Sequence, residues 1–266
     1  MEARLSESAG ILGRYALVLE TLAASPDGMT LTELIRATAL PRGTLHRLIG
    51  SLREVGYVAP RDGRKVYGLG PRLLRLLHLG AAPASVAALA RPMLQELCER
   101  FGETAYLAKL TGTRVESAAM VLPDTGGQTF VQPGRIMPVH ASSSAKAIFA
   151  FQDPALLDKV LAAPRERYTA GTVTDDAEVR ADLEKVRLQG YAICVNELDP
   201  GVASYACPVQ LEGVGVIYAV GMVGFEERVG RFDAAEIVGA LHGVADRLAS
   251  RLQAGLPMAA LVDNAP

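Results

Sequence analysis

The sequence predicts an α+β protein in which an N-terminal winged helix-turn-helix is joined by a linker helix to a larger α/β domain. The first part is predicted by residues 30–68, which follow the order helix, tight turn, helix and hairpin. The second is predicted by strand-like segments that alternate with helical ones from residue 85 onward. Charge separates the same parts, because residues 1–75 carry 11 Lys and Arg against 7 Asp and Glu, whereas the remainder carries 16 against 22. This asymmetry is expected when one domain contacts nucleic-acid phosphates.

Composition indicates a globular protein that is large enough for two domains. Half of the 266 residues are hydrophobic and 21% are charged, which is not the composition of a disordered chain. No apolar run approaches the roughly 18 residues of a membrane helix, and the polar N-terminus does not resemble a secretory signal. Three cysteines without a CxxC pair indicate reduced thiols and a cytoplasmic protein. The four histidines lie far apart, so we expect neither a metal site nor a cofactor.

Apolar spacing predicts three helices in the N-terminal part. The first spans residues 11–24, and the second is short, with Thr30 or Thr32 available to cap its free N–H groups. Pro41 opens the third helix, where its missing N–H costs nothing, and Gly56 suits a left-handed cap at the end. Four apolar residues of this third helix recur at i, i+3, i+4 and i+7 and share one buried face: Leu45, Leu48, Ile49 and Leu52.

The opposite face of the third helix is polar and basic, which suits insertion into a DNA major groove. Two apolar segments then flank residues 61–65, whose Asp-Gly pair is a strong hairpin signal and whose basic residues would place positive charge at the tip. The residues predicted to contact DNA are Thr30, Arg42, Thr44, His46, Arg47, Ser51, Arg61, Arg64 and Lys65.

An amphipathic helix pair alone is weak evidence for DNA binding, because charged residues usually only solvate an exposed face. The hairpin that directly follows the pair changes this balance. Residues 31–65 contain seven Lys and Arg against three Asp and Glu, so basic charge is concentrated within the motif. We therefore expect double-stranded DNA as a partner.

Small-residue breaks and composition mark the remaining boundaries. The linker is predicted from a Leu- and Arg-rich helical segment, Pro71 to His78, which is followed by the break Gly80–Pro83. The predicted parts in chain order are a flexible tail at 1–8, the winged helix-turn-helix at 9–70, the linker helix at 71–84, the large α/β domain at 85–254 and a second flexible tail at 255–266.

The large domain is predicted to contain a mixed sheet with helices packed on it. Helices are expected at residues 86–101, 144–151, 154–162, 177–189 and 232–252. Strands are expected at residues 104–110, 115–121, 129–132, 191–196, 204–210 and 215–223. The last of these strands is an apolar run typical of a buried sheet.

Ordered blocks over residues 11–250 follow the pattern of a known family. They include Leu40-Pro-Arg-Gly-Thr-Leu-His-Arg-Leu48, Gly134-Arg-Ile-Met-Pro-Val-His-Ala-Ser-Ser-Ser-Ala-Lys-Ala147 and Asn196-Glu-Leu-Asp-Pro-Gly-Val202. In these blocks the chain resembles IclR-family transcriptional regulators. The resemblance implies a GAF-like effector-binding domain, a homodimer or dimer of dimers, and a small organic effector that alters operator binding. Repression relieved by the ligand is the mode that the resemblance favours.

The resemblance also implies where an effector binds. The implied pocket residues are Thr129, Met137, Ser143, Ser144, Cys194, Val202, Ser204, Gly221 and Val223. The chain departs from the family pattern at Ala145, where glycine is usual, and in its run of three serines, Ser142–Ser144. Cys194 departs as well, since many relatives carry an acidic or polar residue at this position.

The chemistry of these residues indicates an organic acid as effector. Free N–H groups and serine hydroxyls at a helix start favour an anion, so we hypothesise that an effector carboxylate docks near Ser143 and Ser144. The alternative is that a serine simply caps the helix. The apolar side chains that would suit an aromatic or aliphatic body are Met137, Val202, Val223 and Phe130.

Other interpretations stay open on the sequence alone. Residues 143–146 spell the S-x-x-K motif of serine acyl enzymes, but the partner motifs S-D-N and K-T-G are absent from the sequence. We therefore expect a protein that is not an enzyme. Glu197 and Asp199 could act as paired carboxylates, and Cys194 and Cys207 as redox sensors, although turn capping and apolar packing are commoner roles. The competing function classes are an acyl-hydrolase-like enzyme with an appended DNA-binding head and a DNA-binding protein without a ligand.

Overall fold

The computed structural model describes residues 10–61, 65–81, 83–124 and 131–254. The chain divides into two compact units, residues 1–78 and residues 79–266. Within the described ranges no single helix is long and apolar enough to cross a membrane, and only the bent pair 71–80 and 84–101 meets that test together, by length and composition. In the same ranges no group of three or more His, Cys, Asp or Glu could hold a metal ion.

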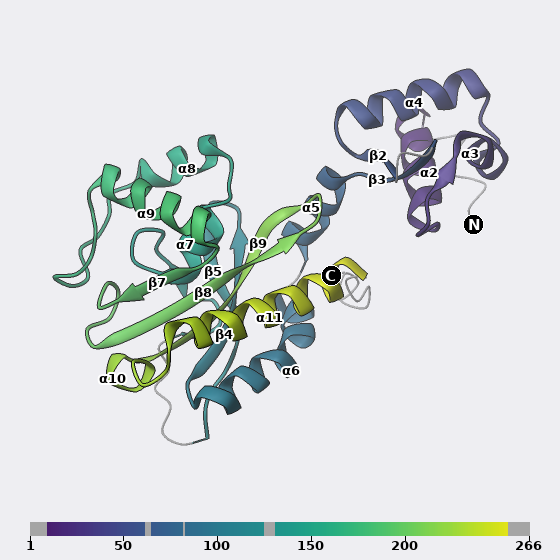
Figure 1. Ribbon diagram of the computed structural model, residues 1–266. Coiled ribbons are helices and arrows are strands. Elements are labelled where there is room, and N and C mark those ends of the chain that lie inside the picture. Colours follow the sequence, from purple (N-terminus) through teal and green to yellow (C-terminus); the bar gives the residue numbers. More distant parts are fainter. Residues whose placement is uncertain (1–9, 62–64, 82, 125–130, 255–266) are drawn as a thin grey trace, which may run out of the picture. The chain divides into compact units, whose positions relative to one another are not determined.

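The N-terminal unit combines a helix-turn-helix with a three-stranded wing (Figure 1). Its helices are α2 (Gly10–Ala23), α3 (Leu31–Thr38), α4 (Arg42–Glu54) and the linker helix α5 (Pro71–Gly80), which runs on past the unit. Its strands are β1 (Met29–Thr30), β2 (Val58–Arg61) and β3 (Val66–Leu69), in the antiparallel order β1-β3-β2. Its core consists of Val18, Leu22, Leu34, Leu45, Leu48, Ile49, Leu52 and Val58. The four apolar residues predicted to share one face of α4 are thus all buried.

Local capping explains where the helices of the motif begin and end. Thr30 and Glu33 form a capping box: the Thr30 hydroxyl accepts from the Glu33 N–H at 3.3 Å, and the Thr30 N–H donates to Glu33 Oε2 at 2.7 Å. The tight turn after α3 places Ala39 in the left-handed region, with φ of 54°. Gly56 takes φ of +75° after α4, and the Tyr57 N–H donates back to the last turn at 2.8 Å. The predicted glycine cap is confirmed.

Two features of this unit differ from the sequence prediction. β1 is not predicted; it forms because Gly28, with φ of +79°, turns the chain so that Met29 pairs with Tyr67. Ile11, although it falls on the apolar stripe of α2, is 66% exposed, whereas Val18 further along the helix is buried. The helix therefore reaches the core only beyond its first turns.

The C-terminal unit is a six-stranded sheet with helices on both faces (Figure 1). Its strands are β4 (Thr104–Thr111), β5 (Arg114–Val121), β6 (Ile136–Met137), β7 (Ala192–Val195), β8 (Val202–Leu211) and β9 (Gly215–Phe225), in the order β6-β5-β4-β9-β8-β7. Its helices are α6 (Pro83–Phe101), α7 (Ser143–Phe149), α8 (Pro154–Leu161), α9 (Asp176–Gln189), α10 (Glu226–Val229) and α11 (Ala234–Ala254). α6 and α11 pack together on one face, and α7 covers the other with α9 against it.

The sheet is antiparallel at every strand pairing of the described residues, so the prediction of a mixed sheet is wrong. Long apolar runs such as β9 arise because helices cover both faces of the sheet. This double burial removes the apolar–polar alternation that normally indicates an antiparallel strand. The strand that pairs with the outer side of β5 is β6, at one edge of the sheet. A strand is predicted at residues 129–132 instead, but residues 131–132 are not in a strand and residues 129–130 lie outside the described ranges.

A buried lysine ties the start of this unit to the sheet. Lys109 on β4 is 3% exposed and donates to the carbonyls of Leu79, at 3.1 Å, and Ala81. These carbonyls lie at the end of α5 and in the break before α6, where the last carbonyls of a helix lack partners within it. Burial lowers the pKa of Lys109.

Candidate functional site

The exposed face of α4 carries most of the residues predicted to contact DNA. Arg42, His46 and Arg47 are exposed, and Thr44 and Ser51 are half-buried at the edges of this face. The first turn of the helix contains no acidic residue, so its cations meet no carboxylate there. This face can present guanidinium, imidazole and hydroxyl donors to base edges and phosphates along a major groove.

One cation of the wing is engaged in a hydrogen bond within the N-terminal unit. Arg61, the last residue of β2, donates to the Pro26 carbonyl, so part of its guanidinium is already engaged. Lys65, just before β3, is exposed. Thr30 is occupied by the capping box of α3, and Arg64 lies outside the described residues. Of the wing cations that the structure describes, Lys65 therefore has the clearest access to phosphate.

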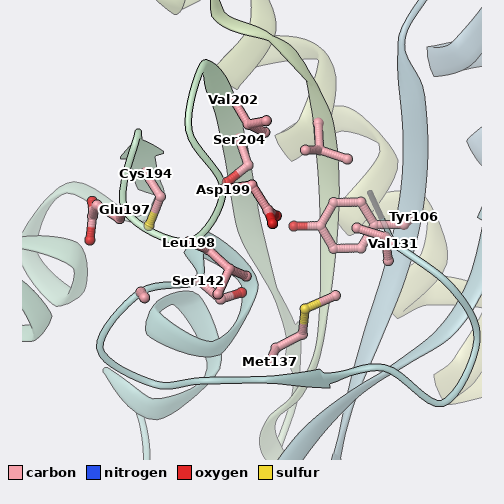
Figure 2. A pocket seen from close by; sticks show the side chains of 12 residues that line it. Tyr106, Val131, Met137, Ser142, Cys194, Glu197, Leu198, Asp199, Val202 and Ser204 are labelled. Carbon is pink, nitrogen blue, oxygen red and sulfur yellow. The ribbon is translucent and has the colours of Figure 1, made fainter. Parts of the chain in front are cut away.

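A pocket lies between the sheet and α7 in the C-terminal unit (Figure 2). Side chains from neighbouring strands meet there because the register places Cys194 opposite Ser204 and Ser204 opposite Val223. Residues directly opposite each other on neighbouring strands point to the same face of the sheet, so these three line one wall. The lining residues are Tyr106, Val131, Met137, Ala141, Ser142, Cys194, Glu197, Leu198, Asp199, Val202, Ser204 and Val223.

Five of the residues predicted to bind an effector line this pocket, namely Met137, Cys194, Val202, Ser204 and Val223. Ser143 and Ser144 lie behind its wall with fully buried side chains. The Ser144 Oγ is 3.1 Å from the Oγ of Ser142, which does line the pocket. Thr129 and Phe130 lie outside the described residues.

A chain of hydroxyls runs along the back of the pocket. The Tyr106 hydroxyl is 3.3 Å from Ser143 Oγ, and that serine donates to Ser204 Oγ at 2.9 Å. Gly221 makes room for the tyrosine ring, because a Cβ at this position would come within 2.4 Å of the Tyr106 Cζ. Burial raises the pKa of Tyr106, so its hydroxyl stays neutral and able to donate. The predicted residue Gly221 thus shapes the pocket through Tyr106, which sequence patterns do not identify.

The hydrogen bonds at the start of α7 test the alternative that a serine simply caps this helix. Ser142 is the residue before the first turn, yet its side chain makes no capping hydrogen bond. The first N–H groups of a helix have no acceptor within it. Ser142 lines the pocket and does not satisfy these groups with its side chain.

A buried charge cluster adjoins the pocket at Lys146. Its Nζ is 2.6 Å from Asp182 Oδ2 and 2.6 Å from Glu197 Oε2, and its side chain is 3% exposed. Burial opposes the charge, but the carboxylates of Glu197 and Asp182 outweigh it and raise the pKa of Lys146. Burial also raises the pKa of the adjacent Cys194 thiol. Lys146 is therefore a fixed ammonium rather than the free base that an S-x-x-K enzyme needs.

A second ion pair involves the other acidic lining residue. Asp199 comes from the loop between β7 and β8 and points toward the hydroxyl end of Tyr106 (Figure 2). Its Oδ2 lies 3.2 Å from Arg135 Nη2. Asp199 and Glu197 thus each pair with a separate cation.

The pocket is small in this structure. Its cavity volume is about 30 Å³. That is room for about two water molecules. A ligand with more than a few heavy atoms would require a lining side chain to move.

Comparison with known proteins identifies the family. The model of the IclR helix-turn-helix domain matches residues 12–62, and that of the bacterial transcriptional regulator IclR C-terminal domain matches residues 81–250. The chain belongs to the IclR family. Residues 12–62 are accordingly the DNA-binding domain of a transcriptional regulator, and residues 81–250 are its effector-binding domain.

Named relatives of this IclR-family regulator cover most of the chain. The HTH-type transcriptional regulator BhcR of Paracoccus denitrificans is 32% identical over 206 residues, which cover 76% of this chain and 74% of BhcR. The glycerol operon regulatory protein of Streptomyces griseus is 30% identical over 246 residues, which cover 92% and 96% of the two chains. Both relatives are named as regulators and neither as an enzyme.

Solved structures share the fold. An IclR homolog from Microbacterium hydrocarbonoxydans, complexed with 4-hydroxybenzoate, has a TM-score of 0.60 at 27% identity and covers 92% of this chain and 99% of its own. The Thermotoga maritima IclR has a TM-score of 0.57 at 20% identity and covers 91% and 98%. The latter supports the fold alone.

Proposed function

We propose that this regulator represses transcription from a double-stranded DNA operator and that a small organic acid in the pocket weakens its operator binding. The observation that carries the proposal is the convergence of three hydroxyls, from Tyr106, Ser142 and Ser204, on an otherwise largely apolar pocket. Apolar walls with a few placed polar groups are the usual makeup of small-molecule sites. The related Microbacterium protein binds 4-hydroxybenzoate, which supports an acid as the ligand class.

The effector carboxylate is proposed to bind at the start of α7. Hydroxyls and helix-start N–H groups both donate to anions. Ser143 and Ser144 contribute indirectly, because they hold the hydroxyls of Ser204 and Ser142 in place. The limited room favours a short aliphatic or a compact aromatic acid, with its body against the valine and methionine side chains.

The regulator is proposed to bind its effector without transforming it. Lys146 is held by two carboxylates at 2.6 Å, and burial keeps the Cys194 sulfur in its thiol form. Neither group is an activated nucleophile or a free base. Turnover of any effector acid, followed by chromatography of the mixture, would contradict this part of the proposal.

The proposed working form is a homodimer or a dimer of dimers in the cytoplasm, where the chromosome is accessible. Helix-turn-helix dimers read two half-sites about 34–36 Å apart, which requires two DNA-binding domains. Light scattering of the purified chain would give its mass, and an operator recovered from random duplexes should contain an inverted repeat. A monomer bound to a single half-site would contradict this arrangement.

The DNA contacts can be separated by substitution. Arg47→Ala should cost about 1–3 kcal/mol on the operator and relax the preference at one base pair. Lys65→Ala should weaken binding to all duplexes alike and reduce the slope of log K against log salt by about one. Fluorescence anisotropy at several salt concentrations measures both. The control is Lys159→Ala, an exposed position on α8 of the other unit, and equal losses on all sequences for Arg47→Ala would argue against base contacts.

Effector response is tested by a thermal-shift screen with short aliphatic and aromatic acids. A ligand that binds the folded state raises the melting temperature by mass action. The same acids should then weaken operator binding in the anisotropy assay. If acids stabilise the protein without changing operator affinity, the proposed regulation is wrong.

A further inference from the structure

Two carboxylates of the chain itself, those of Glu197 and Asp199, line the effector pocket. Asp199, from the loop at residues 196–201, points toward the hydroxyl end of Tyr106 (Figure 2). Its Oδ2 is 3.2 Å from Arg135 Nη2, and the two side chains are 37% and 33% exposed, respectively. The chain thus places an acid of its own beside the hydroxyl that is proposed to meet an effector.

Arg135 is held at the edge of the sheet by its backbone. Its N–H donates to the Gln132 carbonyl at 2.9 Å, and its carbonyl accepts from the Ser117 N–H at 3.0 Å. Burial raises the pKa of Tyr106, and the charge of Arg135 partly offsets that rise. The guanidinium lies beside the pocket because it contacts Asp199, which lines it.

We propose that Arg135 binds the effector carboxylate together with the donors at the start of α7, and that Asp199 is a built-in competitor, which occupies Arg135 until an acid displaces it. The inference rests on the proposed function and adds the ligand class, a monocarboxylate, and the residue that selects it. A guanidinium binds a carboxylate through a planar fork of N–H donors. Asp199 presents that same group from within the chain.

The two ion pairs at the pocket differ in their ability to exchange. Lys146 is 3% exposed and held by both Asp182 and Glu197, so breaking this cluster would leave buried charges unpaired. The pair of Arg135 and Asp199 is one-third exposed, and ion pairs of this kind contribute little and rearrange readily. An incoming anion can therefore replace Asp199, but it cannot easily replace Glu197.

The small volume of the pocket and its negative charge both favour an acid that replaces Asp199 over an acid that binds beside it. An acid that entered with Asp199 in place would meet a like charge in a partly desolvated pocket. The pocket also has room for only about two water molecules while the Asp199 side chain points into it. Withdrawal of this side chain removes the repulsion and enlarges the cavity in one movement.

The test compares acids with their neutral amides by titration calorimetry on the full chain. The probes are acetate, propionate and benzoate, each with its amide. Loss of the competitor raises the fraction of molecules that are open to ligand, so Asp199→Ala should bind the acids about tenfold more tightly. Arg135→Met should bind them about tenfold more weakly and lose the preference for acid over amide.

Three further variants keep the result interpretable. Glu184→Ala removes the carboxylate from an exposed pair with Arg187 on α9, where the two groups are 2.6 Å apart, and should bind like the parent. Arg135→Lys keeps the charge but loses the fork, so it should fall between the parent and the methionine variant. Asp199→Asn keeps the shape of the side chain and should still strengthen acid binding. Thermal unfolding of every variant verifies its fold.

Several outcomes would overturn the inference. These are an Asp199→Ala protein that binds acids no more tightly than the parent, an equal gain for amides, or an Arg135→Met protein that keeps the preference for acids. Absence of acid binding in every variant would overturn it too. Failure of the proposed function looks different: acids bind, and bind Asp199→Ala more tightly, yet operator affinity does not respond.

Discussion

Cys98, Cys194 and Cys207 show how burial decides the chemistry of single residues. All three are free and buried, and burial raises the pKa of each thiol, that of Cys207 to about 12. The thiolate is the reactive form of cysteine. The structure therefore favours apolar packing over redox sensing, the two roles that the sequence leaves open for Cys194 and Cys207.

Thiol reagents provide the residue-scale test. At about pH 8 a group with a pKa of about 12 is ionised in roughly one molecule in ten thousand. Native protein should therefore react slowly with Ellman's reagent, whereas all three cysteines should react after unfolding in guanidinium chloride. Rapid labelling of one thiol in the native protein would identify a reactive cysteine and contradict the packing role.

At the scale of elements, the pocket depends on the fit between β4 and β9. Tyr106 and Gly221 are direct register partners on these strands, and the tyrosine ring lies where a larger residue would have its Cβ. The ring in turn meets Ser143 of α7 through its hydroxyl. A single glycine thus lets a strand side chain reach across the sheet to the helix that covers it.

Gly221→Ala should disturb this fit. The added methyl group must displace the Tyr106 ring, at a cost of about 1–3 kcal/mol of unfolding free energy. The control is Gly239→Ala on α11, where an added Cβ would meet no atom within 4 Å. This substitution should stabilise the helix by about 0.5–1 kcal/mol. Urea unfolding measures both. Equal stability changes for the two variants would show that the ring does not depend on this glycine.

The contact between β4 and the linker makes a second prediction at this scale. Lys109→Met should leave the carbonyls of Leu79 and Ala81 without their donor, which costs about 1–3 kcal/mol when carbonyls are buried. Hydrogen exchange at the break between α5 and α6 should accelerate. The control is Lys185→Met, at an exposed position on α9. Unchanged exchange in Lys109→Met would mean that other contacts hold the linker.

The same lysine gives a pH dependence. Burial lowers the pKa of Lys109 below its ordinary value of 10.5, so the unfolded chain binds this proton more readily than the folded chain. Stability should then rise as pH climbs from the folded pKa toward 10.5. Lys109→Met should lack this contribution, which the difference between the two urea unfolding curves at each pH would reveal.

At the scale of the whole molecule, the helix-turn-helix and the pocket lie in different compact units. Residues 1–78 contain the helix-turn-helix and the wing, and residues 79–266 contain the pocket. Lys109 belongs to the same unit as the carbonyls that it binds. The C-terminal unit therefore carries its own core, its own pocket and its own anchor for the linker.

A fragment of residues 79–266 should fold alone. We expect a cooperative unfolding transition by circular dichroism and the same acid affinities as the full chain, but no operator binding. The complementary fragment, residues 1–78, should bind DNA without responding to acids. A C-terminal fragment that folds but does not bind acids would show that the pocket needs the rest of the chain.

The sequence alone determined the features that depend on neighbouring residues. The buried face of α4, the cap at Thr30 and the left-handed Gly56 follow from contacts within a few positions, where helical geometry is fixed by spacing. The order of the elements and the family also follow from the sequence, because ordered blocks along the chain carry both.

Only the tertiary structure decided the strand directions and the composition of the pocket. Tyr106 meets Ser143 across 37 positions, Ser143 meets Ser204 across 61, and Arg135 meets Asp199 across 64. The predicted effector residues within the described ranges all lie in or behind the pocket wall. Tyr106 lines the pocket as well, but no local pattern of the sequence places it there. Periodicity shows which face of a strand is buried. It does not show which strand lies beside it or in what register, since these depend on long-range packing.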